Sequence, residues 1–378
     1  MLQKPYMKLA AASLLCTLAL GSRGALADTV YKQTNLVSDL PGVAALTDPD
    51  LRNPWGIAYG PSGPFWISNN GTNTSTLYNG AGAKITLPGN ITAVNVPGSP
   101  TGVVFNNTTG FKLPNGQAAT FLFAGEGGTL RGWNFPSGAT TAQVQDMSGS
   151  NAIYKGIAIA TVGSAPRLYA TNFHNGAVDT FDSNFKYTGS FTDTTVGDGF
   201  APFNVQNIGD HLFVTFARQD ADREDDVAGA GNGFVDEFNP DGTLVRRFAS
   251  NGTLNSPWGV ALAPAGFGQF GGDLLIGNFG DGRINAFDPR TGSFLGQLQG
   301  ANGPLSIEGL WGLKFGNGAA AGPTDTLFFT AGIAGPGAIE DHGLFGSITA
   351  VPEPSSGLLI VAGLACVVLL RKRLIDSV

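Results

Sequence analysis

Cysteine occurs only twice in this chain, and histidine only three times. Cys16 and Cys366 both lie in apolar stretches near the chain ends, so no disulfide is expected to hold the long central part together. The histidines, His174, His211 and His342, are far apart, and none has zinc-ligand spacing or lies in a nucleophile elbow. Only 13% of the residues are charged, and no long segment has the apolar spacing of an amphipathic helix. These deficits argue against a disulfide scaffold, a zinc finger and an α/β-hydrolase.

Glycine is abundant instead, with 56 residues, and it marks an internal repeat. A short apolar tract built around a small residue recurs six times at intervals of about 50 residues. The tracts occupy residues 53–58, 100–105, 154–159, 202–206, 256–261 and 310–315. We take Gly56, Gly102, Gly156, Phe203, Gly259 and Gly312 as their equivalent points. A period of this length is typical of a propeller or a solenoid.

Each tract is followed by two further apolar runs and, after turn residues, by room for a fourth strand. Four short strands rich in β-branched and aromatic residues form one propeller blade. The sixth copy reaches Ala350 without a fourth strand, whereas the alternating segment at 29–37 belongs to no copy. We therefore predict an all-β, six-bladed β-propeller of four-stranded antiparallel blades, closed by an N-terminal strand that completes the last blade. A solenoid, the alternative, would leave both end segments unpaired.

The start of the chain has the organisation of a secretory signal. Two lysines precede an apolar stretch at 9–20, and Ala25 and Ala27 occupy the two positions that a signal peptidase recognises. We expect residues 1–27 to be removed.

The end of the chain carries a second targeting pattern. A triplet at Pro352, Glu353 and Pro354 is followed by an apolar stretch at 355–370 and then by three basic residues. This order resembles the PEP-CTERM sorting signal of Gram-negative bacteria that make exopolysaccharide. The resemblance implies that an exosortase cuts near the triplet after transient anchoring in the inner membrane. A plain C-terminal membrane anchor is the alternative.

The net charge of the chain and the targeting patterns at its two ends indicate which partners the protein binds. The chain has a net charge of −7, and removal of its basic ends makes the remainder more acidic, which disfavours nucleic acid and anionic lipid. Residues 1–27, 28–350 and 351–378 are predicted to be a signal peptide, the propeller and a sorting signal. We expect signal peptidase and exosortase as processing partners, exopolysaccharide or another surface protein as a ligand, and membrane contact only through the unprocessed tail. The predicted location is the cell envelope or extracellular matrix of a Gram-negative bacterium.

In a propeller, the loops that enter the first strands and leave the second strands meet on one face around the central channel. Oxygen-bearing side chains at these places are candidate Ca²⁺ ligands. They are Asn69, Glu126, Asn172, Asn278 and Glu308. Propeller lactonases and lyases use such a central metal. The alternative is that the amides only satisfy the backbone of their own loops.

A catalytic centre on that face would need an acid or a base beside the ligands. The candidates are His174, Lys155 and Glu126. Whether they converge depends on the geometry of the channel.

One loop differs from the others in charge. Residues 219–226 carry five carboxylates and one arginine, and the candidate ligands are Asp220, Asp222, Glu224 and Asp226. Counted from Asp220, the sixth and twelfth positions lack the Gly and Glu of an EF-hand. A looser Ca²⁺ loop that stabilises the domain is one interpretation, and a solvated acidic insert is the other.

The central region resembles an uncharacterised family of exported bacterial propellers that often carry the same tail, and distantly resembles NHL-type repeats. The resemblance implies fold and export but no activity. Two function classes follow. The first is a non-enzymatic matrix or binding protein associated with exopolysaccharide. The alternative is a metal-dependent hydrolase or lyase that acts on a lactone or sugar acid at the channel.

Overall fold

The computed structural model describes residues 29–250, 252–335 and 339–352, and residues 30–351 form one compact unit. The predicted signal peptide with Ala25 and Ala27, and the part of the predicted sorting signal that includes Glu353 and Pro354, lie outside the described residues. Pro352 is the last residue of β27. Strands dominate the described part of the chain, with four short 3-10 helices between them: η1 (Asn70–Thr72), η2 (Phe135–Ser137), η3 (Ser148–Ser150) and η4 (Gly268–Phe270).

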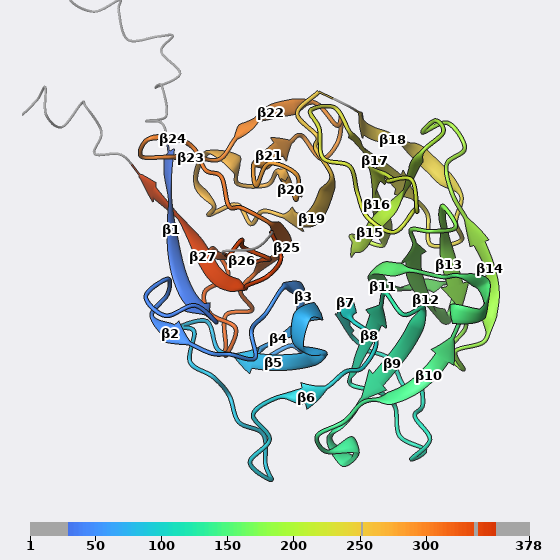
Figure 1. Ribbon diagram of the computed structural model, residues 1–378. Helices are drawn as coiled ribbons and strands as arrows, with labels where there is room; N and C mark the ends of the chain where they lie inside the picture. Colours follow the sequence, from blue (N-terminus) through green and yellow to red (C-terminus); the bar gives the residue numbers. More distant parts are fainter. Residues whose placement is uncertain (1–28, 251, 336–338, 353–378) are drawn as a thin grey trace, which may run out of the picture. The chain divides into compact units, whose positions relative to one another are not determined.

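Six blades are arranged around a centre, as Figure 1 shows; five are four-stranded sheets, and the sixth has a short fifth strand at its edge. The first three blades are β3 (Pro54–Ala58), β4 (Phe65–Asn69), β5 (Thr74–Tyr78) and β6 (Val94–Asn95); β7 (Pro100–Phe105), β8 (Phe121–Gly125), β9 (Thr129–Trp133) and β10 (Ala142–Asp146); and β11 (Tyr154–Val162), β12 (Ala165–Asn172), β13 (Ala177–Phe181) and β14 (Tyr187–Phe191). The fourth and fifth are β15 (Phe200–Ile208), β16 (His211–Arg218), β17 (Gly233–Phe238) and β18 (Leu244–Ser250); and β19 (Pro257–Leu262), β20 (Leu274–Asn278), β21 (Ile284–Phe287) and β22 (Phe294–Gln297). The predicted six-bladed propeller is confirmed.

The sixth blade is assembled from both ends of the described chain. Its strands are β25 (Leu310–Phe315), β26 (Leu327–Ala331), β27 (Leu344–Pro352) and β1 (Thr29–Ser38), with the short β2 (Leu46–Thr47) beside β1. Figure 1 shows β1 alongside β27. A small ribbon of β23 (Gln299–Gly300) and β24 (Gly303–Pro304) connects the fifth and sixth blades. The prediction that an N-terminal strand completes the last blade is confirmed.

The buried apolar side chains form clusters around the ring of blades. Six of the hydrophobic clusters in the described residues lie between neighbouring blades, and a seventh lies at the centre. Each sheet therefore buries both faces against its neighbours, which lets a chain with little helix form a large core from short strands.

Every innermost strand contains a β-bulge at the same level of the blade. In β11, β15 and β19, the extra residues are Lys155, Phe203 and Trp258, which have no partner in the adjacent strand register. In β3, β7 and β25, the register skips two successive residues, the first of which is Trp55, Thr101 and Trp311, respectively. Because a bulge re-aims the side chain that it carries, these six residues form one ring, which we call the bulge ring.

The residue after each bulge lies against the next blade. A Cβ atom on Gly56 would lie 2.6 Å from Thr101 O, and one on Gly102 would lie 2.7 Å from Ile157 N. Glycine recurs in the sequence because this close approach leaves no room for a side chain. The fourth blade differs, since Asn204 takes this place and donates to Trp258 O at 2.8 Å. The prediction from the sequence that Phe203 is the equivalent of the glycines was wrong by one residue. Phe203 is the bulged residue, and Asn204 is the equivalent of the glycines.

Substitution of Gly56 by Ala is expected to destabilise the propeller by about 1–3 kcal/mol, since overpacking against a rigid backbone costs this amount. Chemical denaturation measures the change. Gly149→Ala is the control, because a Cβ atom there meets nothing within 4 Å and its backbone is not left-handed. Equal unfolding midpoints for the two variants would contradict the close-approach explanation.

Candidate functional site

The bulge ring closes the channel with aromatic side chains. Trp55 stacks on Trp311 with a centroid distance of 3.6 Å, and Trp258 meets Trp311 edge-on at 5.7 Å. The indole nitrogens of Trp55 and Trp311 both donate to Asn53 Oδ1, at 3.0 and 3.2 Å, and that of Trp258 donates to Lys155 O at 3.1 Å. All three indoles are buried and hydrogen-bonded, so they form a fixed plug between the blades.

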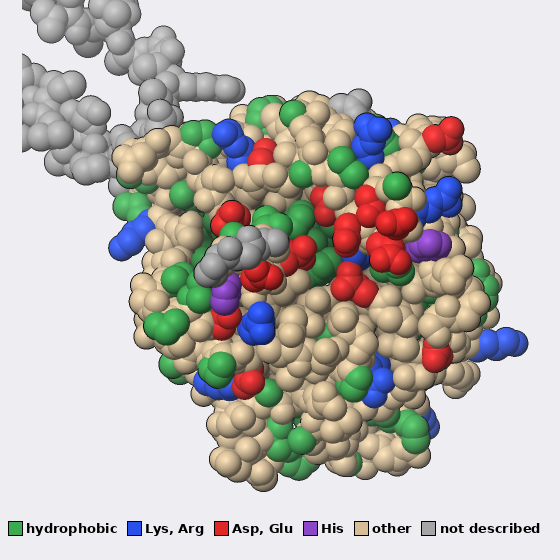
Figure 2. All heavy atoms as spheres, viewed as in Figure 1, with side chains coloured by type: hydrophobic (Ala, Val, Ile, Leu, Met, Phe, Trp, Pro, Cys, Tyr) green, Lys and Arg blue, Asp and Glu red, His purple; other side chains and the backbone are tan. Residues whose placement is uncertain are grey.

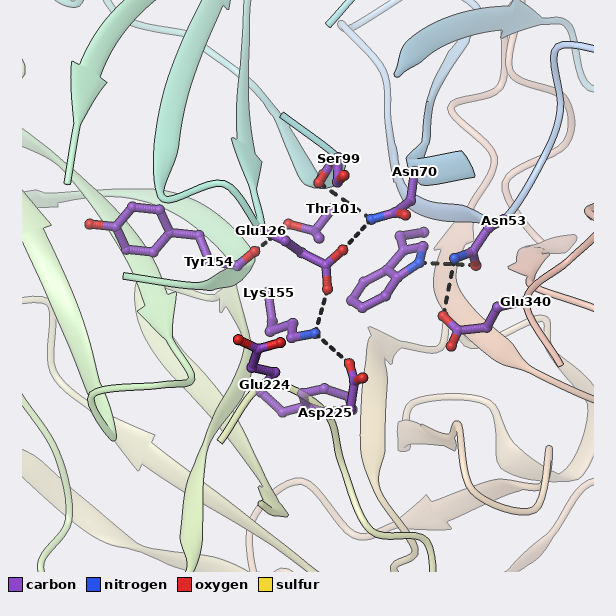
Figure 3. Close-up of polar contacts among 12 residues, drawn as sticks. Asn53, Asn70, Ser99, Thr101, Glu126, Tyr154, Lys155, Glu224, Asp225 and Glu340 are labelled. Carbon is purple, nitrogen blue, oxygen red and sulfur yellow. Dashed lines mark hydrogen bonds and ion pairs between the residues drawn. The ribbon is translucent and has the colours of Figure 1, made fainter. Parts of the chain in front are cut away.

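Lys155 occupies the bulge-ring position of the third blade, and only 1% of its side chain is exposed. Its Nζ lies 2.5 Å from Glu126 Oε1, 3.2 Å from Asp225 Oδ1 and 5.2 Å from the centre of the Trp55 ring, and Figure 3 shows the two ion pairs. Burial opposes the charge of this ammonium group, but the two carboxylates outweigh burial and raise its pKa above the ordinary value. Lys155 is therefore a charged group, and a lysine that acts as a base or nucleophile requires the opposite shift.

Amide side chains of the first blade hold the carboxylates in place. Asn70 Nδ2 donates to Glu126 Oε2 at 2.7 Å, so both oxygens of Glu126 have partners. Asn53 Nδ2 donates at 3.1 Å to Oε1 of Glu340, which lies on the loop before β27 (Figure 3). The two groups meet at Trp55, which donates to Asn53 Oδ1 and whose ring lies 5.2 Å from Lys155 Nζ. Together they form a network that joins five of the six blades or their loops: Asn53, Asn70, Glu126, Lys155, Asp225 and Glu340.

A pocket of about 280 Å³ opens beside Lys155. Its walls include the rings of Trp55, Trp311 and Phe279 and the carboxyl groups of Asp225, Asp226 and Glu340. Figure 2 shows acidic side chains gathered around the centre of this face. A small ligand with an apolar surface and a neutral or positive polar group fits this combination.

Two of the pocket carboxyls hold protons more tightly than usual. Burial raises the pKa of Asp226 to about 6, although Ser256 and Lys155 oppose the change. Burial also raises the pKa of Glu340 to about 7, against the hydrogen bond from Asn53. Asp226 Oδ2 is buried and has no hydrogen-bond partner among the described residues. Carboxyls that titrate near neutrality in a pocket are a feature of acid–base sites and of charge-selective binding sites.

Replacement of Glu340 by Gln is expected to alter how stability depends on pH. The pKa of Glu340 rises from 4.5 to about 7 on folding, so its contribution to stability is present below about pH 4.5 and is lost as the pH rises through 7. Wild-type protein should therefore lose stability relative to Glu340→Gln between about pH 5 and pH 7. Urea unfolding across this range measures the difference, with the exposed Glu224→Gln as control. Parallel curves for wild type and Glu340→Gln would exclude this titration.

The three asparagines predicted as channel ligands are buried in their own blades. Asn69 donates to two threonine hydroxyls of β5 at 3.0 and 3.1 Å. Asn172 donates to Asp179 Oδ2 at 2.9 Å, and Asn278 donates to Thr253 O at 2.7 Å. These bonds use the amide nitrogens, whereas Oδ1 of Asn69 and Oδ1 of Asn278 are buried without a hydrogen-bond partner among the described residues. Glu126 is the member of the predicted set that belongs to the Lys155 network.

Two other candidates, Glu308 and His174, form no hydrogen bond with the residues of the Lys155 network in the described part of the chain. Glu308 is exposed, and its Oε2 accepts from Ala334 N at 3.4 Å. His174 follows Phe173 at the end of β12, and its Nδ1 is buried without a hydrogen-bond partner among the described residues. Of the three catalytic candidates, the structure pairs Lys155 with Glu126 and gives His174 no bond to either.

The acidic side chains of the loop at 219–226 have different contacts. Asp220 Oδ1 accepts from Glu224 N at 2.9 Å, which fixes a turn of the loop. Asp222 and Glu224 are exposed, whereas Asp226 lines the pocket. Asp225, absent from the predicted ligand set, reaches Lys155. The acidic loop therefore makes contacts both within itself and with the third blade.

No group of three or more His, Cys, Asp or Glu side chains is placed to hold a metal ion within residues 29–250, 252–335 and 339–352. Calcium at the loop or at the channel stays a prediction. In the same described segments, no helix has the length and apolarity needed to cross a membrane, and the predicted span at 355–370 lies outside them.

Sequence reasoning left Asn53, Asn70 and Asp225 out of the candidate ligand set, and it missed Glu340 and the aromatic plug. One signal was available for the plug. The residue before the small residue of each repeat reads Trp, Thr, Lys, Phe, Trp and Trp, so Lys155 is a cation in an otherwise mostly aromatic series. No comparable signal marks Glu340, which lies in the loop between β26 and β27.

The protein is therefore a six-bladed β-propeller with an acidic, aromatic pocket at one mouth of its channel. No family model matches the chain. Uncharacterised protein R648 of Acanthamoeba polyphaga mimivirus is 38% identical over 323 residues, which cover 80% of this chain and 77% of R648. Uncharacterised protein L690 of the same virus is 36% identical over 310 residues, 78% of this chain and 80% of L690. The chain belongs to the family of these two proteins.

These relatives are viral, so they give no support to the bacterial origin that the tail suggested. Among solved structures, a streptogramin B lyase aligns with a TM-score of 0.49 and 10% identity, over 85% of this chain and 98% of the lyase. Regucalcin, a calcium-binding protein of Agrobacterium tumefaciens, aligns with a TM-score of 0.49 and 13% identity, over 81% of this chain and 93% of its own. At such identity the likeness concerns the fold alone.

Proposed function

We propose that the protein is an exported, non-enzymatic binding propeller that recognises a polysaccharide or a surface protein at the channel mouth. The observation that carries this proposal is the paired state of Lys155 and Glu126, which leaves the predicted base and acid bound to each other beside a ligand-sized pocket. Trp55 and Trp311 line the pocket, so a sugar ring or an apolar group would meet the small exposed part of their rings. The carboxyls of the pocket disfavour anionic polymers and favour neutral or amine-bearing ones.

Tryptophan fluorescence tests this proposal, because two of the five tryptophans line the pocket. Titration with chitosan oligosaccharides, which carry amines, is expected to change the emission, and titration with alginate, which carries carboxylates, is not. Glu340→Gln and Asp226→Asn should weaken the chitosan response, and Asp210→Asn, at an exposed position in the turn between β15 and β16, should leave it unchanged. No response to neutral, cationic or anionic glycans would refute polysaccharide binding at this pocket.

The exported state rests on the two chain ends. We expect the protein from its source organism to begin at residue 28 and to end near Pro352–Glu353–Pro354 after exosortase processing. Intact mass spectrometry measures both ends. Secreted protein that still carries residues 371–373 would contradict the sorting signal and favour a plain anchor.

A second candidate is a hydrolase or lyase that acts on a lactone or sugar acid at the same pocket. It is favoured by Asp226 and Glu340, whose raised pKa values suit a proton donor near neutral pH. Turnover of a lactone or uronide panel, lost in Asp226→Asn and Glu340→Gln, would establish it. Absence of turnover at pH values from about 5 to 8, with and without Ca²⁺, would exclude it.

A calcium-dependent form of either function stays a prediction from the acidic residues. Ca²⁺ that binds only the folded protein should raise the melting temperature with concentration. Asp220→Asn combined with Asp222→Asn should abolish the shift if the loop binds the ion, and Glu126→Gln should do so if the channel oxygens bind it. Identical melting curves in Ca²⁺ and in chelator would contradict both places.

A further inference from the structure

The opposite end of the channel contains a second pocket, of about 290 Å³, that the sequence did not indicate. Its walls come from the innermost strands of five blades. Ile57, Val103, Ile157 and Ile159 are among the apolar lining residues, but polar atoms make up the larger part of the exposed lining. Further inward, the channel narrows to a space of about 20 Å³ lined by the glycines beside the bulge ring and by Trp258. The pocket is therefore blind and is separated by the aromatic plug from the acidic mouth.

One cationic side chain lines this pocket. Lys314, in β25, has no hydrogen bond or ion pair with any residue that the structure describes, and its Nζ lies 5.4 Å from the centre of the Tyr59 ring. Burial lowers the pKa of Lys314, and no carboxylate offsets this effect. Lys155 at the other mouth shows the contrast, since there two carboxylates outweigh the cost of burial.

A second polar atom beside the pocket also lacks a partner. Asn207, which lines the pocket, donates through Nδ2 to Ile159 O at 2.9 Å. Its Oδ1 is buried and accepts no hydrogen bond from the described residues. Buried polar atoms are nearly always paired, so the unpaired Asn207 Oδ1, in the same pocket as the half-buried Lys314 that lacks a counter-charge, indicates that a ligand supplies the missing groups.

We propose that this pocket binds an amphiphilic carboxylic acid, with its carboxylate on Lys314 and its hydrocarbon part against the isoleucine and valine walls. The carboxylate supplies the counter-charge that Lys314 lacks, and a charge-assisted hydrogen bond in a pocket between the blades is stronger than one in bulk water. A hydroxyl group on the ligand would satisfy Asn207 Oδ1. Anionic ligands are excluded from the other mouth by its carboxylates, so the two ends of the channel select opposite charges.

Calorimetric titration of the full-length protein with octanoate and with octanol tests the proposal. Octanoate is expected to bind wild type at least about ten-fold more tightly than octanol. Lys314→Met should remove this difference by weakening octanoate alone, and Lys314→Gln serves the same purpose if the first variant does not fold. Lys186→Met is the matched control, because Lys186 is exposed and distant in sequence from the pocket residues. Failure of wild type to bind octanoate, or equal octanoate binding by wild type and both Lys314 variants, would overturn the proposal.

Discussion

Deletion of Thr29–Ser38 is expected to abolish the cooperative unfolding transition of the propeller. This strand is hydrogen-bonded to β27 and completes the sixth blade, so its loss leaves an unpaired edge and opens the ring. It also removes Tyr31 from the cluster between the fifth and sixth blades and Val37 from the cluster between the sixth and first. Calorimetry and near-ultraviolet circular dichroism measure the effect.

A milder variant tests the same closure without removing backbone bonds. Tyr31 is 1% exposed, stacks on Phe270 at 6.0 Å and donates its hydroxyl to Phe267 O at 3.1 Å. Tyr31→Ala should therefore cost about 3–5 kcal/mol, as do other large-to-small changes of buried aromatic residues. Lys32→Ala, at the exposed neighbouring position, should change stability by less than about 0.5 kcal/mol. A deletion variant that melts like wild type would show that the ring does not need this strand.

Substitution of Lys155 by Met is expected to cost about 3–5 kcal/mol, because it leaves carboxylates unpaired beside a buried apolar plug. Most of the cost should come from Glu126, since Asp225 is 76% exposed and remains solvated. Urea unfolding measures the loss, and Lys186→Met provides the surface control.

The double variant Lys155→Met with Glu126→Gln separates charge from packing. Removal of both charges should recover part of the lost stability, and a double-mutant cycle gives the coupling between the two side chains. If Lys155→Met is as stable as wild type, the ion pairs do not stabilise the fold. If the double variant recovers nothing, the contact of the Lys155 ammonium group with the Trp55 ring is what matters.

The channel site was partly accessible from the sequence. Lys155 and Glu126 were singled out because propeller topology brings the entries of first strands and the ends of second strands to one face, and the structure pairs them. Asn69 and Asn172 were selected by the same reasoning, yet each binds within its own blade. Topology gives the face on which a residue lies. The rotamer and the local hydrogen bonds decide whether its side chain reaches the axis.

The sequence by itself determined the number of blades, their strands, the closing segment at the N-terminus and the face that carries the long acidic loop. These features depend on local patterns, because alternating apolar residues specify strands, and a recurring glycine is required wherever one blade touches the next. Only the tertiary structure decided which charges meet. Asn53, Glu126, Lys155, Asp225 and Glu340 come from different blades or their loops, and no periodicity links them along the chain. They become neighbours because the ring closes and because a bulge of one residue turns Lys155 toward the channel rather than into a blade.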